Sequence, residues 1–183
     1  EYTGKLPEQA IRAAQRRREE MTPHLIDLMR KATAQGRAGQ PVIGNGHLIA
    51  LFLLTEFCAQ EALAAIVEAV ALPDDGPFDL FGDAITEDLS NVLAVLAANR
   101  PNVIEDLIAN RSINEYVRWQ AMQTYLHWVR NGRLTRDEAV ERLRKDLSIA
   151  IENRDRDAVN GLVSELVSYS PREAWNEIKE AYR

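Results

Sequence analysis

Paired carboxylates are the first residues of this 183-residue sequence that could do chemistry. Residues 73–90, PDDGPFDLFGDAITEDLS, contain six Asp or Glu and no basic residue. Asp83 and Glu87 are four positions apart, so on a helix their carboxylates would be neighbours and could act as an acid and a base or hold Mg²⁺. The acids do not have the spacing of a calcium-binding loop. A helix start explains them without a metal, with Asp83 capping a helix over residues 84–97 and Glu87 in its first turn.

The predicted helix at residues 84–97 would also carry a polar face. Its apolar residues, Ile85, Leu89 and Val92, recur at helical spacing and would face the core. The polar residues of the other side are Asp83, Thr86, Glu87 and Asn91. We predict that these four residues contribute to a binding surface, and we predict no metal and no cofactor there.

Aromatic and basic residues form a second candidate surface, on a predicted helix over residues 115–130. His127 lies on a stripe with Gln120, Gln123 and Arg130, and Trp119 lies beside this stripe. Aromatic residues and arginine contribute most of the binding energy of many protein interfaces. We predict that Trp119, Gln123, His127 and Arg130 form a recognition patch. The alternative is that the tryptophans of this helix pack in the core.

The histidines and the cysteine do not have the spacing of a metal site. His24, His47 and His127 come from different predicted helices, and none belongs to an HExxH motif. His47 follows Gly44-Asn45-Gly46 at a predicted helix start, where it could meet an anion, so it is a candidate binding residue. Because Cys58 is the only cysteine, no disulfide can form within the chain, which favours a reducing, cytoplasmic location. The apolar residues around Cys58 predict that it is buried.

The charge distribution indicates what kind of partner to expect. The net charge is −6, and residues 38–99 contain nine Asp or Glu and no Lys or Arg. This block disfavours nucleic acid, whose phosphates require clustered basic residues, and favours a protein or peptide partner, a basic one in particular. The apolar run at residues 47–57 is much shorter than the ~20 residues that span a bilayer, so we predict no membrane segment. The oligomeric state is left open.

Helical signals cover nearly the whole chain, and sustained strand alternation is absent. Apolar residues at helical spacing predict ten helices in five antiparallel pairs, and helix starts are predicted at Thr22, Thr135, Asp155 or Asp157, and Ser170. Pairs that begin every 30 to 45 residues or so are typical of α-solenoids. We therefore predict an all-α fold, a HEAT-like α-solenoid in which residues 1–183 form one domain, with an irregular helical bundle as the alternative. The inner helices would be residues 47–57, 84–97, 115–130 and 157–169.

One helix pair, residues 115–147, resembles a HEAT-type repeat in its order of Val117-Arg118, Ala121, Leu126 and Gly132 before a second amphipathic helix. In such repeats the arginine packs along the stack. Residues 7–153 also resemble the bacterial domain-of-unknown-function family 1186, through the segments HLIALFLLTEF, GDAITEDLSNVLAVL and VRWQAMQTYLHWVRNGRLTRDE. The resemblance implies helical repeats and no assigned activity. For some members it also implies a cysteine-rich zinc-binding tail, from which this chain departs.

The patterns favour a helical-repeat module for protein–protein interaction or scaffolding. The alternative is a metal-assisted hydrolase or lyase that uses Asp83, Glu87 and a histidine. No GxSxG motif, P-loop or Cys/His nucleophile motif occurs in the sequence, so the enzyme is the less favoured hypothesis and we predict no catalytic residue.

Overall fold

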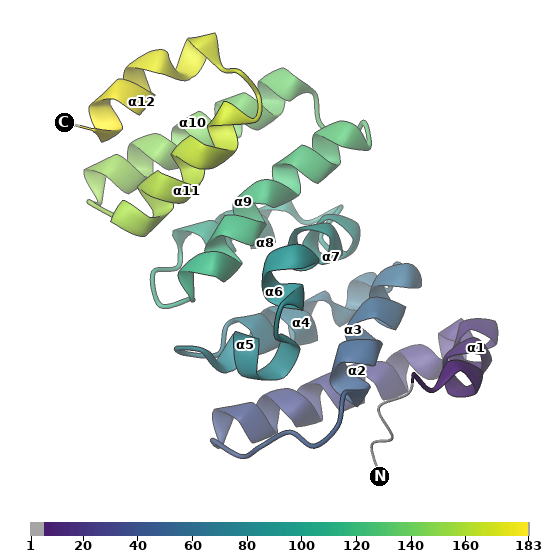
Figure 1. Ribbon diagram of the computed structural model, residues 1–183. Helices are drawn as coiled ribbons and strands as arrows, with labels where there is room; N and C mark the ends of the chain where they lie inside the picture. Colours follow the sequence, from purple (N-terminus) through teal and green to yellow (C-terminus); the bar gives the residue numbers. More distant parts are fainter. Residues whose placement is uncertain (1–5, 183) are drawn as a thin grey trace.

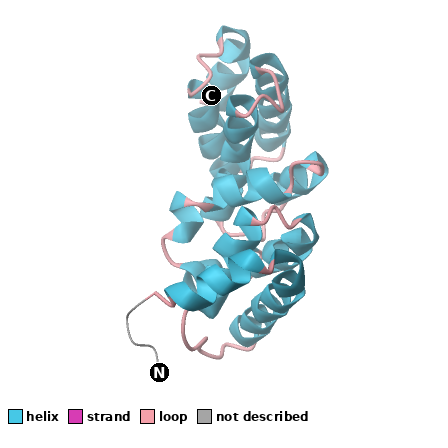
Figure 2. Ribbon diagram, turned by 90° about the vertical axis from the view of Figure 1, so that its right-hand side faces the viewer, coloured by secondary structure: helices cyan, strands magenta, loops and turns pink. Residues whose placement is uncertain are grey.

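The computed structural model describes residues 6–182, which form helices and no strand. The helices rise in the order of the sequence, so that the two ends of the chain lie at opposite ends of the molecule (Figure 1). A view at right angles shows the same elongated stack (Figure 2). The predicted all-α fold is confirmed. Of the helices in residues 6–182, none combines the length and the hydrophobicity needed to cross a membrane.

Twelve α-helices form within the described residues. They are α1 (Glu8–Arg16), α2 (Arg18–Arg37), α3 (Gly46–Glu56), α4 (Leu63–Val70), α5 (Gly76–Phe81), α6 (Ala84–Glu87), α7 (Leu89–Leu96), α8 (Pro101–Ala109), α9 (Glu115–Arg130), α10 (Arg136–Glu152), α11 (Arg156–Val167) and α12 (Trp175–Ala181). The sequence predicts two fewer. Helix α5 lies in the acidic stretch, before the helix start predicted at Asp83, and the helix predicted over residues 84–97 is divided into α6 and α7.

Two rows of helices bury the core. In one row α3 packs against α7, α7 against α9, and α9 against α11. These helices, with α6, are the segments predicted as inner helices. In the other row α2 packs against α4, α8 against α10, and α10 against α12. Leu54, Leu93, Met122 and Leu162, from the four helices of the first row, are completely buried. Removing such side chains from water is the main favourable contribution to folding.

Local capping interactions set the starts of α10 and α11. The Thr135 hydroxyl accepts the Glu138 N–H (3.2 Å), and the Glu138 carboxylate accepts the Thr135 N–H (2.8 Å). Asp155 accepts the Ala158 N–H (3.2 Å) at the start of α11. These predicted helix starts are confirmed, because each cap uses partners only three residues apart.

Two other predicted helix starts are wrong. Thr22 and Pro23 lie inside α2, which begins at Arg18, and the Thr22 hydroxyl donates to the Arg18 carbonyl (2.9 Å). The turn that precedes Thr22 is already helical, and Pro23 removes only one backbone hydrogen bond from it. Ser170 has a φ of 50°, in the left-handed region, and α12 begins only at Trp175, after a 3₁₀ turn.

Cys58 is exposed, contrary to its predicted burial. Helix α3 ends at Glu56, and Cys58 adopts a left-handed φ of 53°. Its N–H donates to the Thr55 carbonyl, and the Ala59 N–H donates to the Leu54 carbonyl, both at 3.0 Å. These two bonds are those of a Schellman helix end. The chain therefore turns away from the core at the end of the apolar run.

Candidate functional site

The helix start that the sequence predicts at Asp83 is not capped by this residue. Asp83 has helical backbone angles (φ −63°, ψ −19°), and its carboxylate makes no capping hydrogen bond. The helix predicted over residues 84–97 is interrupted at Asp88 (φ −121°). The polar residues predicted on this helix are all exposed: Asp83, Thr86, Glu87 and Asn91. They are therefore open to solvent, but on two short helices rather than on one regular face.

Gln120 of α9 joins the two halves of the divided helix. Its side-chain nitrogen donates to the Thr86 carbonyl (3.0 Å), and its side-chain oxygen accepts the Ser90 N–H (3.2 Å). In an uninterrupted helix, the Ser90 N–H would donate to the Thr86 carbonyl four residues earlier. The Gln120 amide thus pairs both groups that the break separates, and it fixes α9 beside α6.

Replacing Gln120 by leucine is expected to lower the free energy of unfolding by about 1–3 kcal/mol, because the Thr86 carbonyl and the Ser90 N–H lose their partner. Urea unfolding followed by circular dichroism measures the change. Gln123→Leu, one turn along α9, is the matched control, because both bonds at the break come from Gln120. Equal stabilities of the two variants would contradict this role for Gln120.

The predicted recognition patch on α9 is divided between two neighbouring helices, and His127 belongs to the contact with α7. Its Nε2 lies 3.2 Å from the Ser90 hydroxyl, and the Trp128 indole donates to the Ala94 carbonyl (2.9 Å). Burial, together with the nearby charge of Arg130, keeps the pKa of His127 below its ordinary value. The imidazole is therefore neutral at pH 7 and serves the packing of α7 on α9.

Trp119 packs against α11 instead. Its indole Nε1 donates to the Asp157 carbonyl (3.0 Å). Gly161 of α11 packs on this ring, where a Cβ would clash with the indole and would lie 2.8 Å from the Met122 sulfur. The missing side chain at Gly161 therefore allows α11 to approach α9 closely.

A cleft of about 230 Å³ lies between α9 and α11 beside this contact. Its lining consists of Trp119, Gln120, Gln123, Asn160, Gly161, Ser164 and Glu165. Trp119 and Gln123 are residues that the sequence predicted for the recognition patch. The amide and hydroxyl groups of the lining offer hydrogen-bond donors and acceptors to a polar ligand.

Glu165 is the charged group of the cleft. Its side chain belongs to a residue only 8% exposed, and its Oε1 is buried without a hydrogen-bond partner within residues 6–182. Burial raises the pKa of Glu165 to about 7, although the charge of Arg130 and the Tyr169 hydroxyl oppose this effect. The Tyr169 hydroxyl, whose pKa burial and Glu165 raise, is also buried and faces the Glu165 carboxyl group, although the two groups do not meet at hydrogen-bond distance. The cleft is therefore lined by a buried carboxyl group that has no basic side chain as an ion-pair partner within residues 6–182.

Glu165 is not among the predicted site residues, although its position in the sequence contains a signal. Glu165 stands beside Leu162 and Leu166 on the apolar side of the helix predicted over residues 157–169. A carboxylate at such a position is carried toward the neighbouring helix together with the apolar residues. Charged groups are rarely buried without a partner, so this placement points to a functional role.

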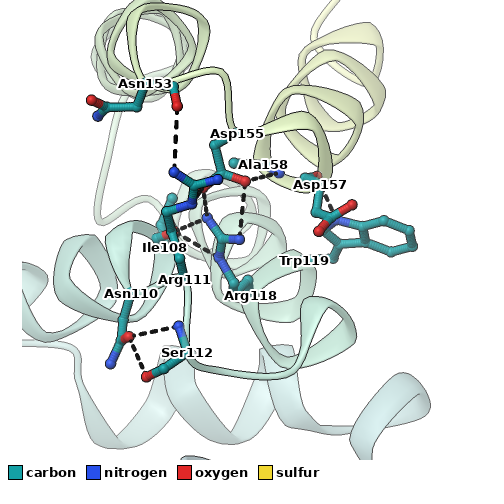
Figure 3. A network of polar contacts seen from close by, with 10 residues as sticks. All are labelled: Ile108, Asn110, Arg111, Ser112, Arg118, Trp119, Asn153, Asp155, Asp157 and Ala158. Atoms are coloured by element: carbon teal, nitrogen blue, oxygen red, sulfur yellow. Dashed lines mark hydrogen bonds and ion pairs between the residues drawn. The ribbon is translucent and has the colours of Figure 1, made fainter. Parts of the chain in front are cut away.

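Arg118 of α9 forms a buried ion pair with Asp155 at the start of α11 (Figure 3). Its guanidinium is 3% exposed and donates to the Ile108 carbonyl (3.0 and 2.9 Å) and to the Asp155 carboxylate (3.3 and 2.6 Å). Although burial opposes it, the hydrogen bonds from Arg118 and from the Ala158 N–H hold the pKa of Asp155 below its ordinary value. Because Asp155 caps the start of α11, this ion pair joins the two helices that form the cleft.

The histidines do not join the carboxylates of the acidic stretch. His47 is buried, with its Nε2 2.5 Å from the Leu80 carbonyl of α5, so it is not available on the surface. The hydrogen bond of His127 goes to Ser90. Neither ring pairs with Asp83 or Glu87. Within residues 6–182, His, Cys, Asp and Glu side chains form no group of three or more that could hold a metal ion.

Comparisons with known proteins place this chain among proteins without an assigned activity. The family model described as "Protein of unknown function (DUF1186)" matches residues 1–183. An uncharacterized protein of Chlamydia muridarum is 30% identical over 183 residues, which covers 98% of this chain and 72% of the relative. An uncharacterized protein of Chlamydia trachomatis is 29% identical, covering 98% of this chain and 71% of the relative. No solved structure matches the chain.

Proposed function

The chain belongs to the DUF1186 family, and we propose that it is a protein-interaction module that binds a segment of a partner protein in the cleft between α9 and α11. The observation that carries this proposal is the buried Glu165 Oε1, which has no hydrogen-bond partner within residues 6–182. An unpaired buried polar atom costs about 1–3 kcal/mol, so native proteins seldom retain one without a use. A partner that donates a hydrogen bond to the accessible side of this carboxyl group would lower the cost.

The surroundings of the cleft favour a segment over a small metabolite. Gln120 lines the cleft and also bonds the Thr86 carbonyl, so the cleft borders the exposed turn at α6. Asp83 and Glu87 are exposed on that turn. A segment that enters the cleft and continues over α6 would therefore meet two further carboxylates. This arrangement favours a basic segment, because opposite charges on the two surfaces speed association and select the partner.

Selection from a displayed library of random peptides tests the proposal, using the protein and a variant with the cleft filled. Ser164 is exposed and lines the cleft, so Ser164→Trp should fill it. The control is Ser148→Trp, at an exposed position of α10 that is not part of the lining. We expect the selected peptides to bind the unmodified protein and Ser148→Trp alike, and Ser164→Trp at least ~10-fold more weakly.

Two results would count against the proposal. In one, no peptide is enriched over a library selected on beads without protein. In the other, the enriched peptides bind Ser164→Trp as tightly as the control variant. Either result would show that the cleft does not receive a protein segment.

A further inference from the structure

We infer that the cleft between α9 and α11 accepts the ammonium group of a lysine side chain; this inference rests on the proposed function and specifies its partner. The residue that recognises the cation is Glu165, which lines the cleft, is more than nine-tenths buried, and forms no ion pair with a basic side chain within the described residues. A carboxylate accepts hydrogen bonds and donates none, so its natural partner is a cationic donor.

The other groups of the lining suit an ammonium. Gln123, Asn160 and Ser164 each carry a side-chain oxygen that can accept a hydrogen bond, and Trp119 provides an indole wall. An ammonium has three donors in a tetrahedral arrangement, which acceptors from several directions can pair. A tryptophan ring attracts cations and packs well on the alkyl part of a lysine.

A guanidinium fits this lining less well than an ammonium. Arginine typically pairs with a carboxylate through two parallel hydrogen bonds that use both carboxylate oxygens. In Glu165 one of the two oxygens, Oε1, is inaccessible, so a ligand in the cleft can reach only the other. The compact ammonium can reach one oxygen and fill its other two donors with the neighbouring amide and hydroxyl groups.

Two other titratable groups act on Glu165 and set the conditions for binding. Arg130 of α9 is exposed, and its positive charge acts on Glu165 without forming an ion pair in the described residues. It would therefore repel an incoming cation. Tyr169, at the end of α11, faces Glu165 with its hydroxyl protonated. A cation in the cleft favours the ionised carboxylate, so binding should release a proton below about pH 7 and tighten as the pH rises to 8.

The test uses three acetylated and amidated peptides, Gly-Gly-X-Gly-Gly, in which X is lysine, norleucine or arginine. Binding is followed by ¹⁵N NMR, through the indole N–H of Trp119 and the amides of residues 160–165. We expect the lysine peptide to bind at least ~10-fold more tightly than the norleucine peptide. Glu165→Gln should abolish this difference, and Arg130→Gln should tighten the binding of lysine.

The inference is overturned if norleucine or arginine binds as tightly as lysine, or if Glu165→Gln leaves lysine binding unchanged. Failure of the inference is distinct from failure of the proposed function. Library peptides that require an open cleft but contain no essential lysine would overturn the inference and leave the proposed function standing. The absence of any peptide that requires the cleft would remove both.

Discussion

Replacing Arg118 by alanine is expected to lower the free energy of unfolding by about 3–5 kcal/mol. The substitution removes four hydrogen bonds to the Ile108 carbonyl and the Asp155 carboxylate. Asp155 is 5% exposed, so the variant would contain a buried carboxylate without its main counter-charge. The expected loss is large because the desolvation cost of Asp155 remains after its partner has gone.

Equilibrium urea unfolding measures this loss, with Arg142→Ala as the matched control. Arg142 pairs with Glu105 at 2.6 Å, but both side chains are more than one-third exposed (37% and 40%). Such a pair contributes up to about 1 kcal/mol. Arg118→Ala together with Asp155→Asn should recover part of the lost stability, since no charge is then buried. A loss no greater than that of Arg142→Ala would show that Arg118 does not hold the stack together.

Replacing Glu165 by glutamine is expected to stabilise the fold by about 3 kcal/mol more at pH 8 than at pH 4. Burial raises the pKa of Glu165 to about 7 in the folded protein, against an ordinary value of 4.5. At pH 4 both the folded and the unfolded chain keep the proton, so burial carries little electrostatic cost. As the pH rises toward 7, the unfolded chain loses the proton first and the folded state becomes less stable. Above pH 7 the cost is constant.

The measurement is urea unfolding of both proteins at several pH values between 4 and 8. Asp146, another carboxyl group whose pKa burial raises (to about 6), is present in both proteins and cancels in the comparison. Glu152→Gln, an exposed position of α10, controls for the change of net charge. If the stability difference between Glu165→Gln and the unmodified protein is the same at pH 4 and pH 8, Glu165 is not buried as an ionisable group.

Binding of a cation at the proposed site would offset part of the free-energy cost of burying the Glu165 carboxylate, and this gain would contribute to the affinity. A ligand that pairs with Glu165 removes the penalty of an unpaired buried carboxylate. The free protein is less stable because of this penalty, and the bound protein is relieved of it. We therefore expect Glu165→Gln to be more stable at neutral pH and to bind lysine poorly. Such an exchange of stability for function is typical of binding sites.

The sequence by itself determined the features that depend on neighbouring residues. Apolar residues at helical spacing defined the helices, and the starts of α10 and α11 followed from Thr135 and Asp155, because a cap uses bonds that span three residues. The same local argument failed at Asp83. The helix that Asp83 should have capped is divided, and the bonds at the break come from Gln120, which is 30 and 34 positions away from its two partners in the sequence.

Only the tertiary structure decided where the candidate site lies. Of the predicted patch on α9, His127 is used in packing on α7, as is the neighbouring Trp128, whereas Trp119 and Gln123 line the cleft with α11. Glu165 became a site residue because Gly161 lets α11 approach Trp119 and so removes the carboxyl group from water. Helix periodicity shows that a residue lies on the side of its helix that packs against another helix. Whether that neighbour supplies a hydrogen-bond partner depends on residues far away in the chain, which pattern alone does not bring together.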